Sequence, residues 1–304
     1  MTAEVRVTAP AKINLCLGVG PVREDGYHPL ATVYQAVGLY DDLTLRPARL
    51  PELTVSGDGV DTTDVPEDER NLAWRAVELL AEHHGHELAV SMHIRKRIPV
   101  AGGLAGGSTD AAAALVGADA LFRLRTPRPE LLALAAELGS DVPFCVEGGT
   151  AIGSGRGELV APVMTRGEYW WVLVPGQGGL STPAVYEKFD RLSGPAVPHP
   201  GVPDELLAAL RAGDPHRLGA ALTNDLEPAA LSFRPALAEL LACGRQASAH
   251  GALVSGSGPT TVFLCESAAH AEVVDLHLQR EAGTAPALVV RGPVPGARAG
   301  GGPR

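Results

Sequence analysis

Residues 99–109 read Pro-Val-Ala-Gly-Gly-Leu-Ala-Gly-Gly-Ser-Thr and hold four glycines within six positions. Glycine has no Cβ atom, so a bulky anion can closely approach the backbone N–H groups of this stretch. The Ala- and Leu-rich run 110–123 follows at once and is typical of a helix, whose N-terminus would add a partial positive charge. The combination predicts a phosphate-binding loop, in which Ser108 and Thr109 add hydroxyl donors. The Ser108 oxygen could also ligate Mg²⁺.

Other interpretations of this glycine-rich stretch remain open or can be set aside. A flexible turn between a strand and a helix would also be rich in glycine. The Walker A motif does not fit, because it needs Gly-Lys-Ser/Thr and no lysine lies between Arg97 and the predicted helix. A Rossmann loop does not fit either, since no following strand that ends in an acidic residue is apparent.

Three further segments carry side chains that can complete a site around these phosphates. In Pro10–Leu15, Lys12 and Asn14 stand two residues apart on a predicted extended segment, so they point to the same face. Asp141 lies in a turn after a predicted helix, and beside a lysine it could orient or deprotonate a hydroxyl. Ser255–Thr260 is a second small-residue loop that can approach a ligand or the first loop closely. Each feature taken alone is also typical of a surface pair, a turn former or a tight turn.

The overall composition restricts the class of protein. Apolar residues make up 45% and charged residues 20% of the 304 residues, which indicates a folded chain long enough for two cores. The formal net charge of −10 argues against binding to nucleic acid or to an anionic membrane. The four scattered cysteines predict buried thiols in a reducing compartment. Neither a signal peptide nor an apolar run of membrane-spanning length is apparent, so we expect a cytoplasmic protein.

Strand-like and helical stretches are mixed without strict alternation, which favours an α+β fold over a doubly wound parallel sheet. We expect two units, 1–160 and 161–295, because glycines are dense near residues 150–168 and the pattern restarts with the apolar strand Trp170–Pro175. The Gly- and Arg-rich residues 296–304 are expected to be disordered. Strands are predicted at 5–8, 42–46, 53–55, 88–94, 170–175, 252–255, 261–264 and 287–290. Helices are predicted at 71–84, 110–123, 130–138, 204–211, 215–221, 235–243 and 268–281.

Several stretches, in this order along the chain, together resemble the motifs of the GHMP kinase superfamily, which includes galactokinase, homoserine kinase and mevalonate kinase. Within it, the sequence most resembles the kinases that act on 4-diphosphocytidyl-2-C-methyl-D-erythritol in the non-mevalonate pathway of isoprenoid biosynthesis. The resemblance covers nearly the whole chain, from about Val7 to Val290. The stretches that carry it are Pro10–Leu15, Gly26–His28, Asn71-Leu72, Ile98–Ala112, Gly139–Pro143 and Ser255–Thr260.

The resemblance implies transfer of the γ-phosphate of ATP, with Mg²⁺, to the 2-hydroxyl of this cytidyl diphosphate substrate. It also implies a two-domain GHMP kinase-like fold with the active site in the cleft. The N-terminal domain would be the nucleotide domain and would resemble domain 2 of ribosomal protein S5, and the C-terminal domain would be ferredoxin-like. By resemblance, Lys12 and Asp141 match the catalytic residues, and Asn14, Tyr27, His28 and Asp141 match substrate contacts. The positions that match the ATP site are Asn71, Leu72, Lys96, Pro99, Gly102, Gly103, Leu104, Ala105, Gly106, Gly107, Ser108 and Thr109.

This sequence departs from the resembled pattern at two positions of the loop. Ala105 stands where a glycine is frequent, and Thr109 stands where a serine is common. No carboxylate is assigned to Mg²⁺, and the chain is expected to act as a monomer or a homodimer. Two alternatives are a kinase for homoserine or a mevalonate derivative, and a nucleotide-binding regulator without turnover. The presence of both Lys12 and Asp141 argues against the regulator.

Overall fold

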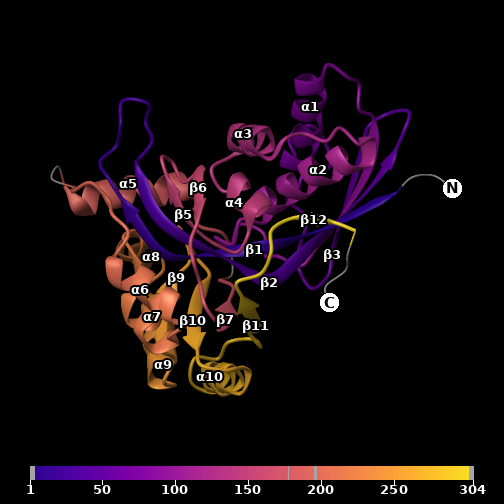
Figure 1. Ribbon diagram of the computed structural model, residues 1–304. Coiled ribbons are helices and arrows are strands. Elements are labelled where there is room, and N and C mark those ends of the chain that lie inside the picture. The colour runs from indigo at the N-terminus through magenta and orange to yellow at the C-terminus, as the bar shows by residue number, and fades with distance from the viewer. Residues whose placement is uncertain (1–3, 177, 195–196, 301–304) are drawn as a thin grey trace.

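The computed structural model describes residues 4–176, 178–194 and 197–300 of the chain. Two long strands, β1 (Val5–Val19) and β2 (Leu30–Pro47), run through both halves of the molecule. Helices pack above one end of this pair, and a second sheet packs below the other end (Figure 1). Within these ranges, no helix is long and apolar enough to cross a membrane.

The larger sheet is organised around the antiparallel pair of β1 and β2. Its strand order is β12-β1-β2-β4-β3, while β5 pairs with β2, β6 with β5 and β8 with β1. The register between β1 and β2 shifts next to Pro10 and again after Asn14, so the pair bends where the candidate residues lie. The other strands of this sheet are β3 (Glu52–Gly57), β4 (Val90–Lys96), β5 (Thr150–Ser154), β6 (Leu159–Pro162), β8 (Thr223–Asn224) and β12 (Arg298–Ala299).

The smaller sheet has four strands, and all of its neighbouring pairs are antiparallel. Numbered along the chain, the strands lie side by side in the order 4-1-3-2, which is the order of a ferredoxin-like sheet. The expected α+β class and the ferredoxin-like C-terminal part are therefore confirmed. The strands are β7 (Tyr169–Val174), β9 (Gly251–Val254), β10 (Thr261–Cys265) and β11 (Leu288–Gly292).

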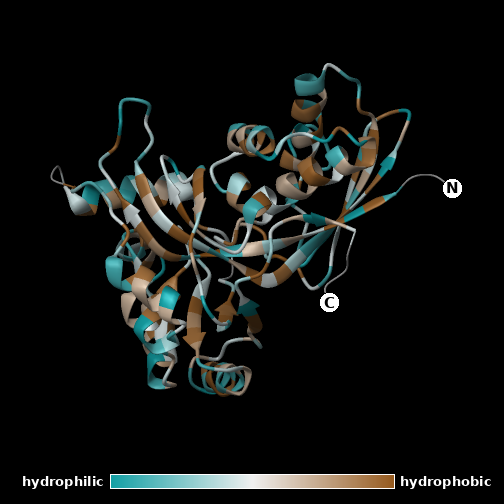
Figure 2. Cartoon of the chain, viewed as in Figure 1, coloured by the Kyte–Doolittle hydropathy of each residue, from teal (hydrophilic) through white to brown (hydrophobic). Residues whose placement is uncertain are grey.

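Ten helices of the described residues cover these sheets. They are α1 (Leu72–His84), α2 (Gly106–Phe122), α3 (Arg128–Leu138), α4 (Val142–Glu147), α5 (Thr182–Ser193), α6 (Asp204–Ala212), α7 (Pro215–Ala221), α8 (Glu227–Phe233), α9 (Ala236–Gln246) and α10 (Ala268–Glu281). One core joins α1–α4 to the larger sheet, and another joins β1 and β2 to the smaller sheet. A third core lies between the smaller sheet and helices α9 and α10. Apolar colour is correspondingly concentrated along the strands where the two sheets meet (Figure 2).

The two long strands were predicted only in part, because their centres are buried on both faces. In β1, all residues from Ala9 to Leu17 are buried, so the alternation of apolar and polar residues disappears there. The expected strand 5–8 is therefore only the first quarter of β1. Helices α4, α5 and α8 are also absent from the sequence-based expectations.

The C-terminal residues correct another expectation. Residues 296–300 were expected to be disordered, yet β12 pairs with β1 and the Ala297 N–H donates to the Cys145 carbonyl at 2.9 Å. Ala297 is buried in the core around α4, so this segment is held by packing as well as by hydrogen bonds. Residues 301–304 lie outside the described residues. The division into domains at residues 160 and 161 stays a prediction, since β8 and β12 return from the second half to the larger sheet.

Candidate active site

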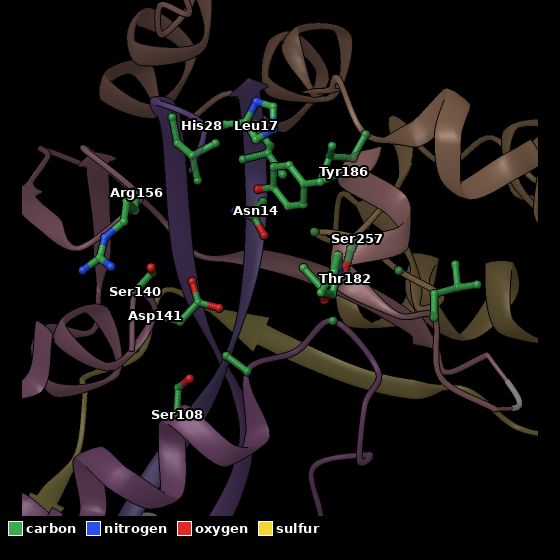
Figure 3. Close-up of a pocket in the computed structure, with 18 of the residues that line it drawn as sticks. Asn14, Leu17, His28, Ser108, Ser140, Asp141, Arg156, Thr182, Tyr186 and Ser257 are labelled. Atoms are coloured by element: carbon green, nitrogen blue, oxygen red, sulfur yellow. The ribbon is translucent and has the colours of Figure 1, made fainter. Parts of the chain in front are cut away.

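A cavity of about 770 Å³ opens between the two glycine-rich loops, the hairpin of β1 and β2, and helix α5. Figure 3 shows Asp141 in its middle, between Ser108 at one end and His28 with Tyr186 at the other. Most of the predicted site residues thus surround one space. The lining residues that the argument uses are Lys12, Asn14, Tyr27, His28, Tyr34, Gly102, Gly103, Ser108, Asp141, Arg156, Tyr186 and Asp190.

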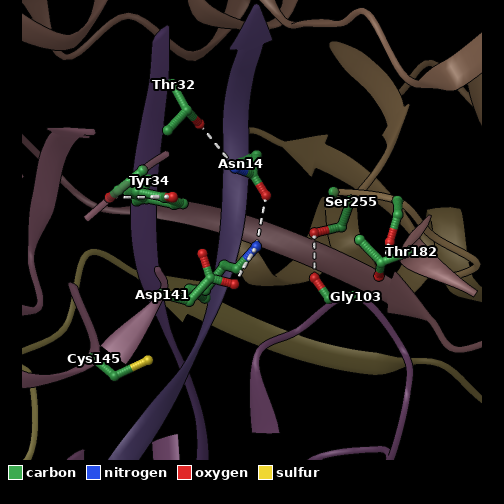
Figure 4. A network of polar contacts seen from close by, with 12 residues as sticks. Asn14, Thr32, Tyr34, Gly103, Asp141, Cys145, Thr182 and Ser255 are labelled. Atoms are coloured by element: carbon green, nitrogen blue, oxygen red, sulfur yellow. Dashed lines mark hydrogen bonds and ion pairs between the residues drawn. The ribbon is translucent and has the colours of Figure 1, made fainter. Parts of the chain in front are cut away.

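Lys12 and Asp141 meet in this cavity although they are distant in sequence. The Lys12 Nζ lies 3.4 Å from the Asp141 Oδ2 and donates to the Asn14 Oδ1 at 2.8 Å (Figure 4). Lys12 is buried, while the side chain of Asp141 remains 29% exposed toward the cavity. The pair can therefore face a bound alcohol together, while the hydrogen bond to Asn14 holds the ammonium in place.

The orientation of Asn14 follows from a chain of hydrogen bonds. The Thr32 hydroxyl donates to the Cys16 carbonyl at 2.6 Å, so toward Asn14 it must accept. The Asn14 Nδ2 fills this role as donor at 2.8 Å, which turns the Asn14 Oδ1 toward Lys12. The bend after Asn14 in β1 keeps both side chains on the cavity face, as the spacing of two residues predicted.

Asp141 is held at the start of a short helix. It is the N-cap residue of α4, which packs against α2 and α3 in the first core. Beside it, burial and then the charge of Asp141 raise the pKa of Tyr34 well above 10. The Tyr34 hydroxyl therefore stays protonated, and its ring lies 5.5 Å from the Lys12 Nζ. Lys12 thus has an aromatic face as well as a carboxylate beside it.

The first glycine-rich loop runs directly into α2, which begins at Gly106 rather than at the expected Asp110. Residues 106–108 are therefore the first turn of a helix, whose backbone N–H groups have no intrahelical partner. No described side chain caps this turn, and no acidic residue lies in it. Ala105 precedes it in the left-handed conformation with φ 60°, which costs an alanine about 1–2 kcal/mol. The loop is built to present N–H groups to an anion.

Not every predicted loop residue faces the cavity. The Thr109 hydroxyl donates to the Pro10 carbonyl at 2.9 Å and is buried, so the expectation that it serves a phosphate is not met here. Leu104 is buried in the second core, and its carbonyl accepts from the Lys12 N–H at 3.2 Å. Leu104, Thr109 and Pro99 thus anchor or border the loop rather than line the cavity.

The second loop, residues 255–260, packs against the first. The Ser255 hydroxyl donates to the Gly103 carbonyl at 3.2 Å (Figure 4), and the Thr260 N–H donates to the Gly102 carbonyl at 3.3 Å. A Cβ atom at Gly103 would lie 2.5 Å from the Ser255 carbonyl oxygen, so only glycine allows this approach. The predicted closeness of the two loops is confirmed.

A smaller cavity of about 200 Å³ continues past the loop toward α1. Leu72 lines both cavities, whereas Asn71 and Lys96 line only the smaller one. Asn71 caps α1 through its Oδ1, which accepts from the Ala73 N–H at 2.9 Å. The Lys96 ammonium lies 2.5 Å from both Asp41 and Asp110 and is buried. The ammonium of Lys96 is therefore already bound by two carboxyl groups of the protein.

The opposite end of the main cavity is aromatic. His28 is buried and its Nδ1 donates to the Gly20 carbonyl at 2.8 Å, because a carbonyl can only accept. Its Nε2 lies 3.6 Å from the Asp190 Oδ2, and its ring centroid lies 5.1 Å from that of Tyr186. Tyr27 is half exposed, with the guanidinium of Arg156 over its ring at 4.9 Å. A planar base can enter between such rings.

Among the residues that line the cavity, sequence reasoning did not single out Tyr34, Arg156, Tyr186 and Asp190, which the argument uses. Tyr34, Tyr186 and Asp190 belong to no glycine-rich motif. Arg156 stands between Gly155 and Gly157, in a stretch whose glycine density indicates only the boundary between the two units. Tyr186 and Asp190 stand four residues apart on α5, so they share one helix face. This spacing is the one sequence signal that relates any of these residues to each other. It predicts a shared helix face but not that this face borders a cavity.

Comparison with known proteins agrees with this arrangement. Residues 71–149 match the model of the GHMP kinases N terminal domain, and residues 206–283 match that of GHMP kinases C terminal. A Nocardioides protein named 4-diphosphocytidyl-2-C-methyl-D-erythritol kinase is 56% identical over 95% of this chain and 97% of its own length. A Thermobifida fusca protein of the same name is 54% identical over 96% of this chain and 97% of its own.

A solved structure agrees as well. The crystal structure of a 4-(cytidine 5'-diphospho)-2C-methyl-D-erythritol kinase superposes with a TM-score of 0.77 at 32% identity. It covers 98% of this chain and the whole of that one. The chain therefore belongs to the GHMP kinases and, within them, to the 4-diphosphocytidyl-2-C-methyl-D-erythritol kinase family.

Proposed function

We propose that this chain transfers the γ-phosphate of ATP to the 2-hydroxyl of 4-diphosphocytidyl-2-C-methyl-D-erythritol, as part of isoprenoid biosynthesis. The observation that supports it most is the position of Lys12 and Asp141. They lie 3.4 Å apart and between the glycine-rich loop and the aromatic end of one cavity. A donor phosphate on one side and a cytidyl acceptor on the other would meet at this pair.

The reaction requires positioning and neutralisation of charge more than covalent chemistry. The N–H groups of residues 106–108 would hold the triphosphate. Asp141 would accept the proton of the substrate's 2-hydroxyl while the oxygen of that hydroxyl forms a bond to the γ-phosphorus. The bond between the γ-phosphorus and the β-γ bridging oxygen breaks, and ADP leaves. Lys12 would stabilise the charge that gathers on the transferred group.

The cavity also fits a magnesium ion bound with ATP. Mg²⁺ in such sites is held mainly by phosphate oxygens and water, with one or two protein oxygens. The Ser108 hydroxyl is such an oxygen donor, and it lines the cavity in the first turn of α2. When bound, Mg²⁺ would neutralise charge on the β- and γ-phosphates.

The cytosine would occupy the aromatic end. Tyr186 and Tyr27 offer ring faces, and stacking of this kind is worth about 1–3 kcal/mol per base. His28 would supply hydrogen bonds that distinguish cytosine, since its Nδ1 is fixed by Gly20 and its ring by α5. Arg156, beside Tyr27, would face the diphosphate of the substrate.

A panel of acceptor alcohols tests the proposal. Purified protein with ATP and Mg²⁺ should consume ATP rapidly only when 4-diphosphocytidyl-2-C-methyl-D-erythritol is present. Homoserine, mevalonate and reactions without any alcohol should give background rates, and the phosphorylated product should be visible by mass spectrometry. Equal turnover with homoserine or mevalonate, or no turnover with any alcohol, would overturn the assignment.

A further inference from the structure

Imidazole and carboxylate side chains gather at one edge of the smaller sheet, away from the active-site cavity. Metal-binding atoms of His250, Glu266 and His270 all lie within 4.8 Å of one another. The ring centroid of His250 is 5.4 Å from that of His270 and 5.5 Å from that of His216. Three histidines and one glutamate thus converge, and none of them lines either cavity described above.

Regular structure fixes the backbone beneath this cluster. His250 directly precedes β9, and its N–H donates to the Leu264 carbonyl of β10 at 2.8 Å. Glu266 directly follows β10, and His270 lies in the first turn of α10, where its N–H donates to the Ser267 hydroxyl at 3.2 Å. The side chains are therefore presented by strand ends and a capped helix rather than by a loose loop.

His216 is brought to the cluster by an unusually close approach of α7. A Cβ atom at Gly219 of α7 would lie 2.2 Å from the His250 carbonyl oxygen, so this contact requires glycine. The same contact holds His216, three residues earlier on α7, beside the His250 ring. Four chain segments thus meet at one point: α7, the start of β9, the end of β10 and the start of α10 (Figure 1).

We propose that His250, His270 and Glu266 bind a zinc ion at this edge, with His216 or a water molecule as the fourth ligand. Imidazole nitrogens and a carboxylate oxygen are the donors that zinc takes, at about 2.0–2.2 Å in a tetrahedral arrangement. Ligands of such a site lie about 3.3 Å apart, so small side-chain rotations complete the set. Mg²⁺ prefers oxygen ligands, so the magnesium that accompanies ATP does not compete for it.

One contact must change when the ion binds. The His270 Nδ1 accepts a hydrogen bond from the Glu266 N–H at 3.2 Å, which places the proton of the neutral ring on Nε2. Binding through Nε2 moves that proton to Nδ1 and gives up this long hydrogen bond. The loss is small beside a new metal–nitrogen bond, and a protonated Nδ1 can instead donate to a nearby oxygen or water.

A bound zinc ion would cross-link elements of the second half of the molecule. An ion bound by these residues ties α7 and α10 to the edge of the sheet, and it stabilises the folded state because the unfolded chain holds no such site. The site acts apart from catalysis, so its loss should leave turnover of ATP unchanged.

Zinc titration of the full-length chain tests the proposal. Metal-stripped wild type, the variant His250→Ala/His270→Ala, the conservative variant Glu266→Gln and the control His93→Ala would be titrated with ZnCl₂ by calorimetry and melted with and without zinc. His93 is an exposed histidine of β4 that hydrogen-bonds Thr54 and Ser56. Wild type and His93→Ala should bind one zinc ion per chain and melt roughly 5 °C higher at saturating zinc.

The two site variants separate a metal site from unspecific binding. The double variant should lose the one-to-one site and the rise in melting temperature, and Glu266→Gln should weaken binding at least tenfold. Cobalt(II) should show the visible bands of a four-coordinate site with wild type and with His93→Ala, but not with the double variant. No stoichiometric zinc binding by wild type, or unchanged binding by both site variants, would overturn the proposal.

Discussion

Asp141 carries the proposed role of base, and its substitution is the most direct test at the scale of one residue. Asp141→Asn keeps the shape and removes the proton acceptor, so kcat should fall roughly 10²–10⁴-fold. The Michaelis constant for ATP should change little, since the loop N–H groups that hold the phosphates are untouched. Steady-state kinetics with both substrates measure this, with the neighbouring cavity residue Ser140→Ala as a control near wild type. Turnover of Asp141→Asn close to wild type would contradict the role.

His28 should control binding of one substrate only. His28→Ala removes the ring that lies between Gly20, Tyr186 and Asp190, so hydrogen bonds and contacts to the cytosine are lost. We expect the Michaelis constant for the cytidyl substrate to rise about tenfold or more, which corresponds to ~1.4 kcal/mol. The constant for ATP should stay within about twofold. Equal changes in both constants would argue against a base-binding role.

At the scale of an element, the short strand β12 should matter more than its length suggests. Ala297 is buried against α4, its N–H donates to Cys145, and the Gly300 N–H donates to the Arg6 carbonyl at 2.9 Å. A chain that ends at Pro295 loses these contacts, so its free energy of unfolding should fall by about 2 kcal/mol. Urea unfolding measures the change.

A second truncated chain, which retains β12, serves as the matched control. A chain that ends at Gly300 keeps every one of these contacts and should unfold like the full-length chain. If both truncated chains are as stable as the full-length chain, β12 does not contribute to the fold. Because α4 presents Asp141, the shorter chain should also lose activity at a lower temperature.

At the scale of the whole molecule, a buried charge cluster should make stability depend on pH. Asp41 accepts from the Arg97 and Ile98 N–H groups as well as from Lys96, whereas the Asp110 Oδ1 has no partner among the described residues. Burial raises the pKa of Asp110 from 3.8 to about 8, although the Lys96 charge opposes the shift. Burial would lower the pKa of Lys96, but Asp110 and Asp41 together raise it.

The sign of the effect follows from proton binding. Between pH 4 and pH 8 the folded chain keeps the proton on Asp110 and the unfolded chain releases it, so stability falls as pH rises. Asp110→Asn removes this titration and should flatten that decline. The test is the difference in unfolding free energy between wild type and Asp110→Asn at pH 5, 6.5 and 8. A difference that does not vary with pH would contradict the raised pKa.

The sequence alone was sufficient for the family, the α+β class and the proposed reaction. These depend on local chemistry: glycines without Cβ atoms ahead of a helix, and a lysine and an asparagine two residues apart on a strand. Such features act through the backbone within a few residues, so they can be recognised without knowing how the chain folds. The comparisons confirm the family and the fold, while the roles of single site residues stay predictions.

The tertiary structure alone decided which side chains share the cavity and which do not. Tyr186 and Arg156 enter the site only because α5 and the turn after β5 fold against the hairpin, and Thr109 leaves it because its hydroxyl binds Pro10. The 3.4 Å between Lys12 and Asp141 likewise depends on how α4 packs on α2. Contacts between distant segments result from the packing of whole elements, which no short stretch of sequence specifies.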